Sequence, residues 1–231
     1  MTHVLTFRVA VDGLENKIWR RIEITDSRTV AELAYAILAT FDSLAYHLYE
    51  VEHKGITYDS MIDIEDYHGP KKIVDATITK LNKLDFSTEK QMVMNYDFGS
   101  TNTFIITFIE SRDLEKGRGT HYPYIIEGQG HGILDDLSSC ELIDVVRKTD
   151  KIGKSEFYYT RGYEKEKLYD YRNYDIKIDN ALLKGKIEMI KHKYEYYEEW
   201  SIYRHIFYYI KALIYARDFL TFQPFLIINL K

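Results

Sequence analysis

The stretch "QMVMNYDFGSTNTFIITFIESR", residues 91–112, holds two apolar runs on either side of a short polar segment. Both runs are rich in β-branched, aromatic and long apolar residues, which is typical of strands. The segment between them contains Gly99, which can supply the positive φ of a tight turn. The stretch therefore predicts a β-hairpin in which Tyr96 and Phe98 share one face and Asp97 lies on the other.

Two strands and a helix are predicted upstream of this hairpin. Residues 3–11, "HVLTFRVAV", and residues 17–24, "KIWRRIEI", alternate in the manner of half-buried strands joined by a turn. Thr29 followed by Glu32 has the spacing of a capping box, so residues 30–41 are predicted to form a helix.

The segments that flank the 91–112 hairpin are less regular. Residues 47–55, "HLYEVEHKG", are strand-like, and we expect "ITYD" (56–59) to continue that strand past Gly55. Residues 60–90 are mixed and polar, which predicts a loop with a short helix. After the hairpin, residues 140–148, "CELIDVVRK", predict another helix.

This order of elements is typical of an α+β domain. We expect a β-grasp-like sheet with a covering helix over residues 1–150, followed by a helical, tyrosine-rich C-terminal region over residues 151–231. Two apolar stripes in that region have the spacing of amphipathic helices. The first is Leu183, Ile187, Ile190, Tyr194 and Tyr197, and the second is Ile202, Ile206, Tyr209, Leu213, Ala216 and Leu220.

Such stripes need something to pack against. The sheet, each other or a second subunit would serve, so we expect a homo-oligomer or a protein partner to bind through these helices. A membrane span is not expected, because residues 203–221 contain four charged side chains, Arg204, Lys211, Arg217 and Asp218. The apolar tail after Pro224 fits either a terminal strand or a disordered end.

Composition indicates a protein of a reducing compartment. Cys140 is the single cysteine, so the chain forms no internal disulfide. The first residues, "MTHVLTFRVAVDG", are strand-like and lack the layout of a signal peptide. We expect a cytoplasmic location.

Asp97-Phe98-Gly99 spells the magnesium-holding motif of protein kinases. A kinase also needs a glycine-rich loop, a strand lysine and a catalytic loop upstream, and the sequence shows none of them. We therefore interpret the three residues as part of the turn.

"EGQGHGILDD", residues 127–136, follows an apolar strand and precedes a helix, the order in which glycines cradle phosphate. It has neither the lysine of a P-loop nor the spacing of a dinucleotide fingerprint. Its closing residues Asp135 and Asp136 would repel an anion at the helix N-terminus. A flexible entry loop and a small-ligand site with Gly128 and Gly130 both remain open.

A divalent metal site is a further hypothesis. His131, Asp135 and Asp136, joined by Asp97 or His121, offer the nitrogen and oxygen ligands that such ions accept. A nucleic-acid contact is another: Arg20 and Arg21 follow Trp19, which combines charge with a stacking surface. On an alternating strand, however, Trp19 and Arg20 face opposite ways, and we expect Trp19 to be in or near the core.

Four of these motifs, in order over about residues 2–147, resemble the plasmid pRiA4b ORF-3-like family. Members show an "IWRR" strand, an "HLHEF"-like strand, a "YDFGDxWxH" turn and a "YPxxxxGxGxxPPEDxGG" loop. The family occurs in bacteria, archaea and mobile elements, where some members are called insertion-element passenger or TnpR-type proteins. The positions that match are Ile18 to Arg21, His47, Leu48, Tyr96 to Gly99, Tyr122, Pro123, Gly128 and Asp136.

The departures from the family pattern lie in its polar positions. Ser100 replaces the second aspartate of the turn, and Asn102 and Phe104 stand where tryptophan and histidine are usual. Further departures are Ile133 and Leu134 for the prolines, Asp135 for glutamate, and Ser138 and Ser139 for the closing glycines. If those positions form a site in the family, this chain lacks several members of it. The resemblance implies no established activity.

We favour a non-catalytic binding or interaction module, and the resemblance adds an accessory role in a mobile element. The alternative is a metal- or phosphate-dependent enzyme that uses Asp97, His131, Asp135 and Asp136. The second alternative is a nucleic-acid-binding accessory protein. No cofactor is expected apart from the divalent ion of the enzyme hypothesis. The ligand-binding candidates are Tyr96, Asp97, Gly128, Gly130, His131 and Asp136.

Overall fold

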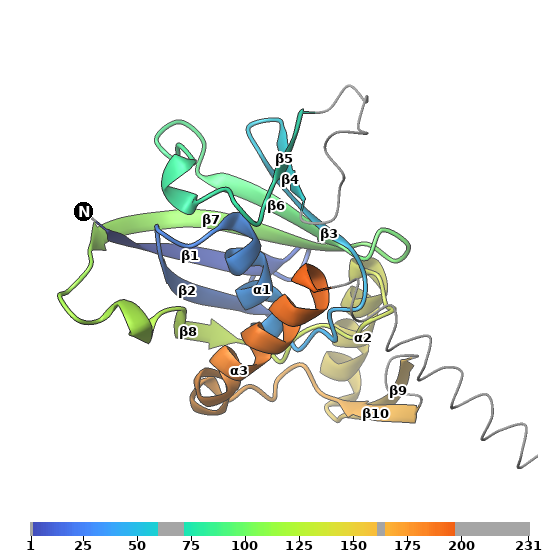
Figure 1. Ribbon diagram of the computed structural model, residues 1–231. Helices are drawn as coiled ribbons and strands as arrows, with labels where there is room; N and C mark the ends of the chain where they lie inside the picture. The colour runs from blue at the N-terminus through green and yellow to red at the C-terminus, as the bar shows by residue number, and fades with distance from the viewer. Residues whose placement is uncertain (1, 60–71, 161–164, 197–231) are drawn as a thin grey trace, which may run out of the picture. The chain divides into compact units, whose positions relative to one another are not determined.

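The computed structural model describes residues 2–59, 72–160 and 165–196 (Figure 1). These residues form a large sheet of eight strands, a separate two-stranded sheet and three α-helices, so the expected α+β class is confirmed. Residues up to Lys191 make one compact unit. The β-grasp-like arrangement and the division of the chain at residue 150 stay predictions.

The large sheet has the strand order β5-β4-β3-β6-β7-β1-β2-β8. Neighbouring strands are antiparallel except for β4 and β5, which are parallel. The strands are β1 His3–Val11, β2 Trp19–Thr25, β3 Tyr49–His53, β4 Ile56–Asp59, β5 Lys72–Asp75, β6 Gln91–Tyr96, β7 Asn102–Asp113 and β8 Tyr124–Gln129. Two 3₁₀ turns, η1 Leu81–Lys83 and η2 Gly119–His121, interrupt the connections.

The predicted hairpin is present as β6 and β7, but its turn differs from the expectation. Positive φ occurs at Asp97 (61°) and Thr101 (54°) rather than at Gly99. Asp97 tolerates this conformation because its side chain accepts hydrogen bonds from the backbone N–H groups of Gly99 and Ser100, at 3.1 and 3.4 Å. Regular alternation ends here, so Tyr96 is buried while Phe98 is 51% exposed.

The expectation that residues 56–59 continue the strand before them is wrong. Lys54 and Gly55 both have positive φ and turn the chain back, so β4 pairs antiparallel with β3. The region 60–90 contributes η1, a helix of only three residues, and strand β5, which was not predicted. Residues 60–71 of that region lie outside the described part of the chain.

The first helix, α1 (Val30–Thr40), begins at the predicted capping box of Thr29 and Glu32. Every one of its residues except Glu32 is buried, so it is enclosed rather than half-exposed. Figure 1 shows α1 in front of β1 and β2, with α3 (Ile176–Glu195) close to it. Asp179 of α3 accepts a hydrogen bond from Thr40, and Lys186 donates to the carbonyl of Ala39 at 3.4 Å.

The predicted helix at residues 140–148 is present as α2 (Ser139–Ile152). Residues 156–160 and 165–169 do not belong to a helical region as expected. They pair antiparallel as β9 (Glu156–Thr160) and β10 (Lys165–Tyr169), and aromatic residues such as those of β9 favour strands. Helix α3 contains Leu183, Ile187, Ile190 and Tyr194 of the first predicted stripe, and all four are buried. The fifth member, Tyr197, lies outside the described residues.

The second predicted stripe at 202–220 and the apolar tail lie outside the described residues. Among the helices of the described part, none combines the length and the apolar character needed to cross a membrane.

Candidate functional site

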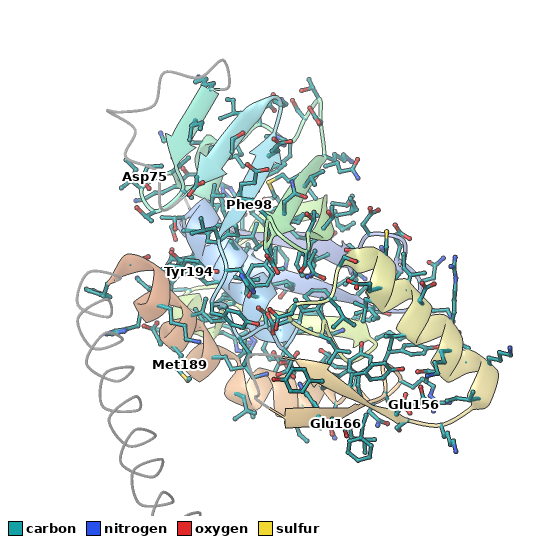
Figure 2. The ribbon with its side chains drawn as sticks, turned by 90° about the vertical axis from the view of Figure 1, so that its right-hand side faces the viewer. Asp75, Phe98, Glu156, Glu166, Met189 and Tyr194 are labelled. Atoms are coloured by element: carbon teal, nitrogen blue, oxygen red, sulfur yellow. The ribbon has the colours of Figure 1, made fainter. Side chains whose placement is uncertain are left out.

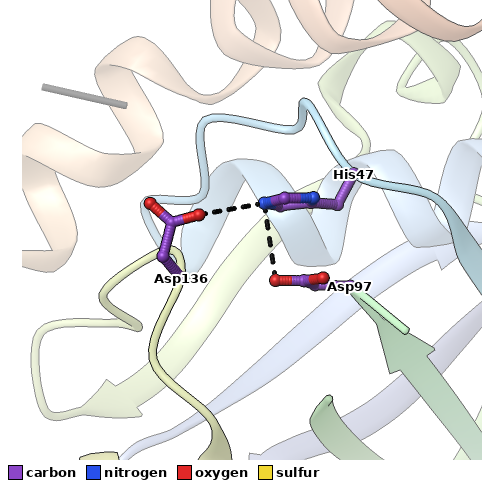
Figure 3. A group of neighbouring side chains, drawn as sticks. All are labelled: His47, Asp97 and Asp136. Atoms are coloured by element: carbon purple, nitrogen blue, oxygen red, sulfur yellow. Dashed lines mark hydrogen bonds and ion pairs between the residues drawn. The ribbon is translucent and has the colours of Figure 1, made fainter. Parts of the chain in front are cut away.

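Three side chains from distant parts of the sequence converge at one end of the large sheet (Figure 3). The Nε2 atom of His47 lies 3.2 Å from Oδ1 of Asp136 and 3.4 Å from Oδ2 of Asp97. One ligand atom from each of the three residues lies within 4.8 Å of the other two. We call His47, Asp97 and Asp136 the carboxylate–histidine cluster.

The sheet places the first two members. β3 and β6 are neighbours in which Tyr49 pairs with Tyr96, and the backbone N–H of Asp97 donates to the carbonyl of Leu48 at 2.9 Å. The residues just before β3 and just after β6 therefore lie at the same end of the sheet. This pairing brings His47 and Asp97 together although 50 positions separate them in the sequence.

The loop before α2 supplies the third member. Ser100, in the turn after Asp97, donates from Oγ to the carbonyl of Asp136 at 3.1 Å. Asn102, which begins β7, donates from Nδ2 to the carbonyl of Leu137 at 2.8 Å. These two bonds fix the 135–137 loop against the β6–β7 turn.

The buried Asp135, next to Asp136 in the chain, connects the three segments that carry the cluster. Its carboxylate accepts hydrogen bonds from Ser43 Oγ at 3.0 Å, the backbone N–H of Leu44 at 2.9 Å and the Tyr96 hydroxyl at 2.9 Å. Burial raises the pKa of this carboxyl, although the three hydrogen bonds and the nearby His47 act in the opposite direction. Asp135 thus links the segment before His47, the strand before Asp97 and its own neighbour Asp136.

The backbone at the cluster is held in conformations that L-residues rarely adopt. Asp97 and Asp136 have φ of 61° and 70°. Such conformations persist where the surrounding structure fixes them, and they concentrate at functional sites. The ring of Tyr46 lies 4.2 Å from that of His47, and burial followed by the negative charge of Asp136 raises the pKa of the Tyr46 hydroxyl well above its ordinary value.

One side of the cluster is open to solvent. The side chain of Asp97 is 7% exposed, whereas those of Asp136 and His47 are 22% and 28% exposed. One imidazole nitrogen and two carboxylate oxygens are ligands that first-row divalent ions accept. Ligands bonded at 2.0–2.2 Å in a tetrahedral arrangement lie roughly 3.3–3.6 Å apart. The separations of 3.2 and 3.4 Å around His47 Nε2 are close to this range.

The candidate residues predicted from the sequence separate into several places. Asp97 and Asp136 meet in the cluster, and Tyr96 contacts Asp135 directly beneath it. His131 faces away from them, with Nε2 3.4 Å from a carboxylate oxygen of Asp42.

Asp135 is not a member of the cluster; its carboxylate is bonded to Ser43, Leu44 and Tyr96 as described above. His121 stacks on Tyr124 at 4.4 Å between ring centroids, in η2 and the start of β8. The structure therefore brings together two of the five residues named for the predicted metal site, Asp97 and Asp136.

Gly128 and Gly130 are packed against protein atoms. A β-carbon on Gly128 would lie 2.8 Å from Cδ of Arg20 and 2.9 Å from the ring of Tyr174. A β-carbon on Gly130 would overlap the carbonyl oxygen of Lys17 and lie 2.9 Å from Cα of Ile18. The glycines allow β8 and its following residues to approach β2 closely, so the space that a phosphate cradle requires is filled.

Arg20 lies in the core, and its face of β2 is the opposite of the one that nucleic-acid contact requires. The side chain of Arg20 is fully buried, whereas Trp19, expected in or near the core, is half-buried. Arg21 is partly exposed and lies 3.3 Å from Glu127. Neither arginine extends freely from the surface.

His47 was not among the candidates predicted from chemistry. It stands alone in the sequence, without a neighbouring ligand at metal-site spacing. The signal that could have found it was its match, with Leu48, to the strand motif of the family quoted above. Asp97 and Asp136 also match motifs of that family. All three members of the cluster therefore occupy positions at which this sequence matches it.

Comparisons with known proteins agree on the fold and leave the activity open. A family model described as plasmid pRiA4b ORF-3-like protein matches residues 3–177, which extends past the 2–147 range of the motifs. A solved structure, a protein of unknown function from Methanosarcina mazei Go1, has a TM-score of 0.61 at 19% identity. The match covers 77% of this chain and 96% of that one. No relative was found among the curated proteins.

Proposed function

The chain belongs to the plasmid pRiA4b ORF-3-like family, and we propose that it binds a divalent metal ion through His47, Asp97 and Asp136. The observation that carries the proposal is the convergence of three ligand atoms from three segments within 4.8 Å of one another. The predicted metal site thus keeps Asp97 and Asp136 and exchanges His131 for His47.

The charges around the cluster favour a bound metal ion over an ion pair between a protonated His47 and the two carboxylates. Asp97 and Asp136 approach the same nitrogen atom of His47, and the buried Asp135 carboxyl is adjacent to them. An imidazole offers a positive charge only when it is protonated. A divalent cation offsets two neighbouring carboxylates at any pH at which they are ionised, and it uses the neutral form of the ring.

Three protein ligands leave coordination positions free, and the exposed side of Asp136 and His47 gives access to them. Zinc sites with three protein ligands and an open position are typical of catalytic centres, and an ion of this class would lower the pKa of a bound water molecule. A hydrolytic activity is therefore the enzyme function to test if binding is found. The Tyr46 hydroxyl, whose pKa is raised, would stay protonated and able to donate a hydrogen bond beside the site.

Isothermal titration of the full chain with Zn²⁺ and with Mn²⁺ tests the proposal. We expect one ion per chain, with a rise in unfolding temperature that EDTA reverses. An ion at 100 times its Kd would stabilise the fold by about 2.7 kcal/mol. His47→Ala, Asp97→Asn and Asp136→Asn should each abolish the heat of binding. Asp135→Asn should weaken it by about 10- to 100-fold, as loss of an outer hydrogen-bonding group does.

Two surface variants serve as matched controls. His121→Ala and Asp144→Asn remove the same types of ligand from exposed positions of η2 and α2. Both should bind the ion as the wild type does. Equal binding by the wild type and by all three cluster variants would show that ions bind elsewhere, and the proposal would then fail.

An interaction module is the second candidate, and the β9–β10 hairpin favours it. Phe157, Tyr159 and Leu168 lie on one face of the hairpin and are 63%, 60% and 55% exposed. Glu156 and Glu166 mark the two strands in Figure 2. Large apolar side chains grouped on a surface are typical of protein contacts. We propose that this face, rather than only the C-terminal stripes, mediates self-association, and an accessory role in a mobile element would use it.

Sedimentation of the full chain over a range of concentrations tests this second candidate. Wild-type protein should show a concentration-dependent increase in mass that Phe157→Ser with Leu168→Ser removes. Ile178→Ser, an equally apolar exposed position on α3, is the control and should leave the association unchanged. A wild-type chain that stays monomeric at all concentrations would exclude self-association through the hairpin.

A further inference from the structure

A pocket of about 450 Å³ lies apart from the carboxylate–histidine cluster, between the C-terminal end of α1 and the first turns of α3. Its polar wall includes Asp42, Asp179 and Lys186, and its apolar wall includes Ile178 and Leu182. Pockets of this size hold small organic ligands. None of the residues on the polar wall belongs to the metal-site proposal.

The centre of the polar wall is a cradle of three oxygen atoms around one ammonium group. The Nζ atom of Lys186 lies 3.6 Å from Oδ1 of Asp42, 3.8 Å from Oδ1 of Asp179 and 3.4 Å from the carbonyl oxygen of Ala39. All three separations exceed the 2.7–2.9 Å of a close charged hydrogen bond. The three oxygen atoms therefore surround the ammonium group of Lys186 but make only long contacts with it.

The two carboxylates of the cradle are held in place by other groups. Asp42 pairs with Lys167 at 2.7 Å through its second oxygen. Asp179 accepts hydrogen bonds from Thr40 and, at 3.2 Å, from the Tyr174 hydroxyl. Because these partners fix both side chains, their Oδ1 atoms keep their positions when Lys186 moves.

The apolar part of the pocket lining is accessible and lies on the same helix as Asp179 and Lys186. Ile178 and Leu182 are one helical turn apart on α3, so their side chains lie on the same face. They are 59% and 51% exposed although they line the pocket. A ligand that entered here would cover this apolar surface while its polar head reached the cradle.

We propose that this pocket binds a small primary organic ammonium ion with an aliphatic tail. Its –NH₃⁺ group takes the place of the Lys186 head group between Asp42 and Asp179, and its tail packs on Ile178 and Leu182. A primary ammonium has three donors, which matches the three oxygens of the cradle. Asp42 stays ionised at neutral pH: burial raises the pKa of its carboxyl, but His131 and Lys167 outweigh this and hold it below its usual range.

Titration calorimetry of the full chain with n-butylammonium chloride tests the proposal, with sodium chloride matching the ionic strength. The wild type should bind saturably, and 1-butanol, which has the same tail without the charge, should bind more weakly. Lys186→Met should bind butylammonium about tenfold more tightly if the tethered lysine occupies the cradle about nine-tenths of the time. Asp42→Asn should weaken binding about tenfold or more, since hydrogen bonds to charged groups are the strong ones.

Lys177→Met is the matched control, because Lys177 is exposed on the same helix and does not line the pocket. It should leave the affinity unchanged. Circular dichroism shows whether Lys186→Met is folded. If it is not, butylammonium binding by the wild type and by Leu182→Ser tests the proposal instead. Leu182→Ser should then bind butylammonium more weakly than the wild type. Absence of saturable binding to the wild type and to folded Lys186→Met would overturn the proposal. Equal affinity for butanol, or no effect of Asp42→Asn, would overturn it as well.

Discussion

Arg20 shows most clearly how a residue changes its role between sequence and structure. Its guanidinium has five N–H donors. They are directed at Thr40 Oγ1 (3.2 Å) and at the backbone carbonyls of Trp19 (2.9 Å), Gln129 (2.8 Å), Thr40 (3.2 Å) and His131. The side chain therefore joins β2, the end of β8 and Thr40, the last residue of α1.

The guanidinium is also enclosed by rings. Its carbon atom lies 3.6 Å from the centroid of Tyr174 and 5.0 Å from that of Phe41, and Nε is 3.7 Å from Asp179. Arginine can make such planar contacts on both faces while donating at its edge. A lysine could not replace these contacts.

Replacement of Arg20 should therefore be costly. We expect Arg20→Lys and Arg20→Met to lower the free energy of unfolding by about 3–5 kcal/mol, since each leaves buried carbonyls and Asp179 without their partner. Urea unfolding of the full chain measures the change. Arg21→Lys, at the partly exposed neighbouring position, should cost less than about 1 kcal/mol. Equal costs at the two positions would show that Arg20 does not join these elements.

Asp42 gives a prediction for pH. His131 and Lys167 outweigh the effect of burial and hold the folded-state pKa of its carboxyl below the ordinary value. The unfolded chain then takes up the proton first as the pH falls, so the stability from Asp42 is complete above about pH 4 and is lost at lower pH.

The free energy of unfolding at pH 7 and pH 3 measures this effect. Asp42→Asn should be less stable than wild type at pH 7 by about 1–3 kcal/mol and should lose less stability on acidification. Asp144→Asn, at an exposed position, is the control for the added amide. An unchanged difference between the two pH values in Asp42→Asn would contradict the assignment.

At the scale of elements, the sequence predicted the strands and helices that carry a regular pattern. β1, β2, α1, β6, β7 and α2 all lie where periodicity or a capping box placed them. The turn at Lys54-Gly55 was missed although the apolar alternation changes phase there, from Tyr49 and Val51 to Ile56 and Tyr58. β9–β10 was missed because its tyrosines suit both a strand and an amphipathic helix, and local pattern does not decide between the two, since the pairing partner does.

Gly130 illustrates a tertiary constraint that a motif search misreads. Its φ is 79°, and a β-carbon there would overlap Lys17 and Ile18 of the neighbouring segment. Gly117 has a similar φ of 82° with no atom within 4 Å of such a carbon. A substitution at Gly117 therefore tests backbone strain alone, whereas a substitution at Gly130 adds steric overlap to the same strain.

We expect Gly117→Ala to cost about 1 kcal/mol in unfolding free energy, the usual effect of a left-handed backbone. Gly130→Ala should cost a further 1–3 kcal/mol or so, because overpacking displaces β8 from β2. Thermal unfolding of the two variants measures the difference. Equal costs would show that β8 and β2 can separate without loss.

The sequence predicted only part of the candidate site. Asp97 and Asp136 were candidates, but their third partner is set by the β3–β6 pairing, which no local spacing reveals. His131 and Asp136 are five positions apart in one loop, yet the turn at Asp136 and the bonds of Asp135 direct them to different sides. A candidate list that uses sequence proximity alone therefore joins residues that the fold separates.

At the scale of the whole molecule, α3 completes the described unit. Leu183, Ile187 and Ile190 are buried, and Asn180 pairs with both backbone groups of Ile125 on the edge strand β8, at 2.9 and 2.8 Å. Each buried aliphatic side chain contributes roughly 1.5–3 kcal/mol. Their sum is comparable with the total stability of a typical domain, about 5–15 kcal/mol.

A chain that ends at Gly153 should therefore lose its cooperative thermal transition. A chain that ends at Tyr196 keeps all of α3 and should retain the transition. Calorimetry of the two truncated chains beside the full chain tests this expectation and, with it, the predicted division at residue 150. A stably folded 1–153 fragment would show that the N-terminal region is an independent domain and that α3 is an addition to it.

The two proposed sites share their loops. Asp42 and His47 lie in the connection between α1 and β3, and His131 and Asp136 lie in the connection between β8 and α2. One loop pair thus contributes residues both to the pocket beside α3 and to the carboxylate–histidine cluster. The sites nevertheless use different side chains, so either can fail its test without the other.

The position of a bound ion tests the central claim most directly. Crystals of the full chain grown with Zn²⁺ and measured at its absorption edge will show the ion as a peak in anomalous difference density. We predict one peak within about 2.0–2.2 Å of His47 Nε2 and of one carboxylate oxygen each from Asp97 and Asp136. A fully occupied peak elsewhere, or none at this position with zinc in excess, would contradict the proposed function.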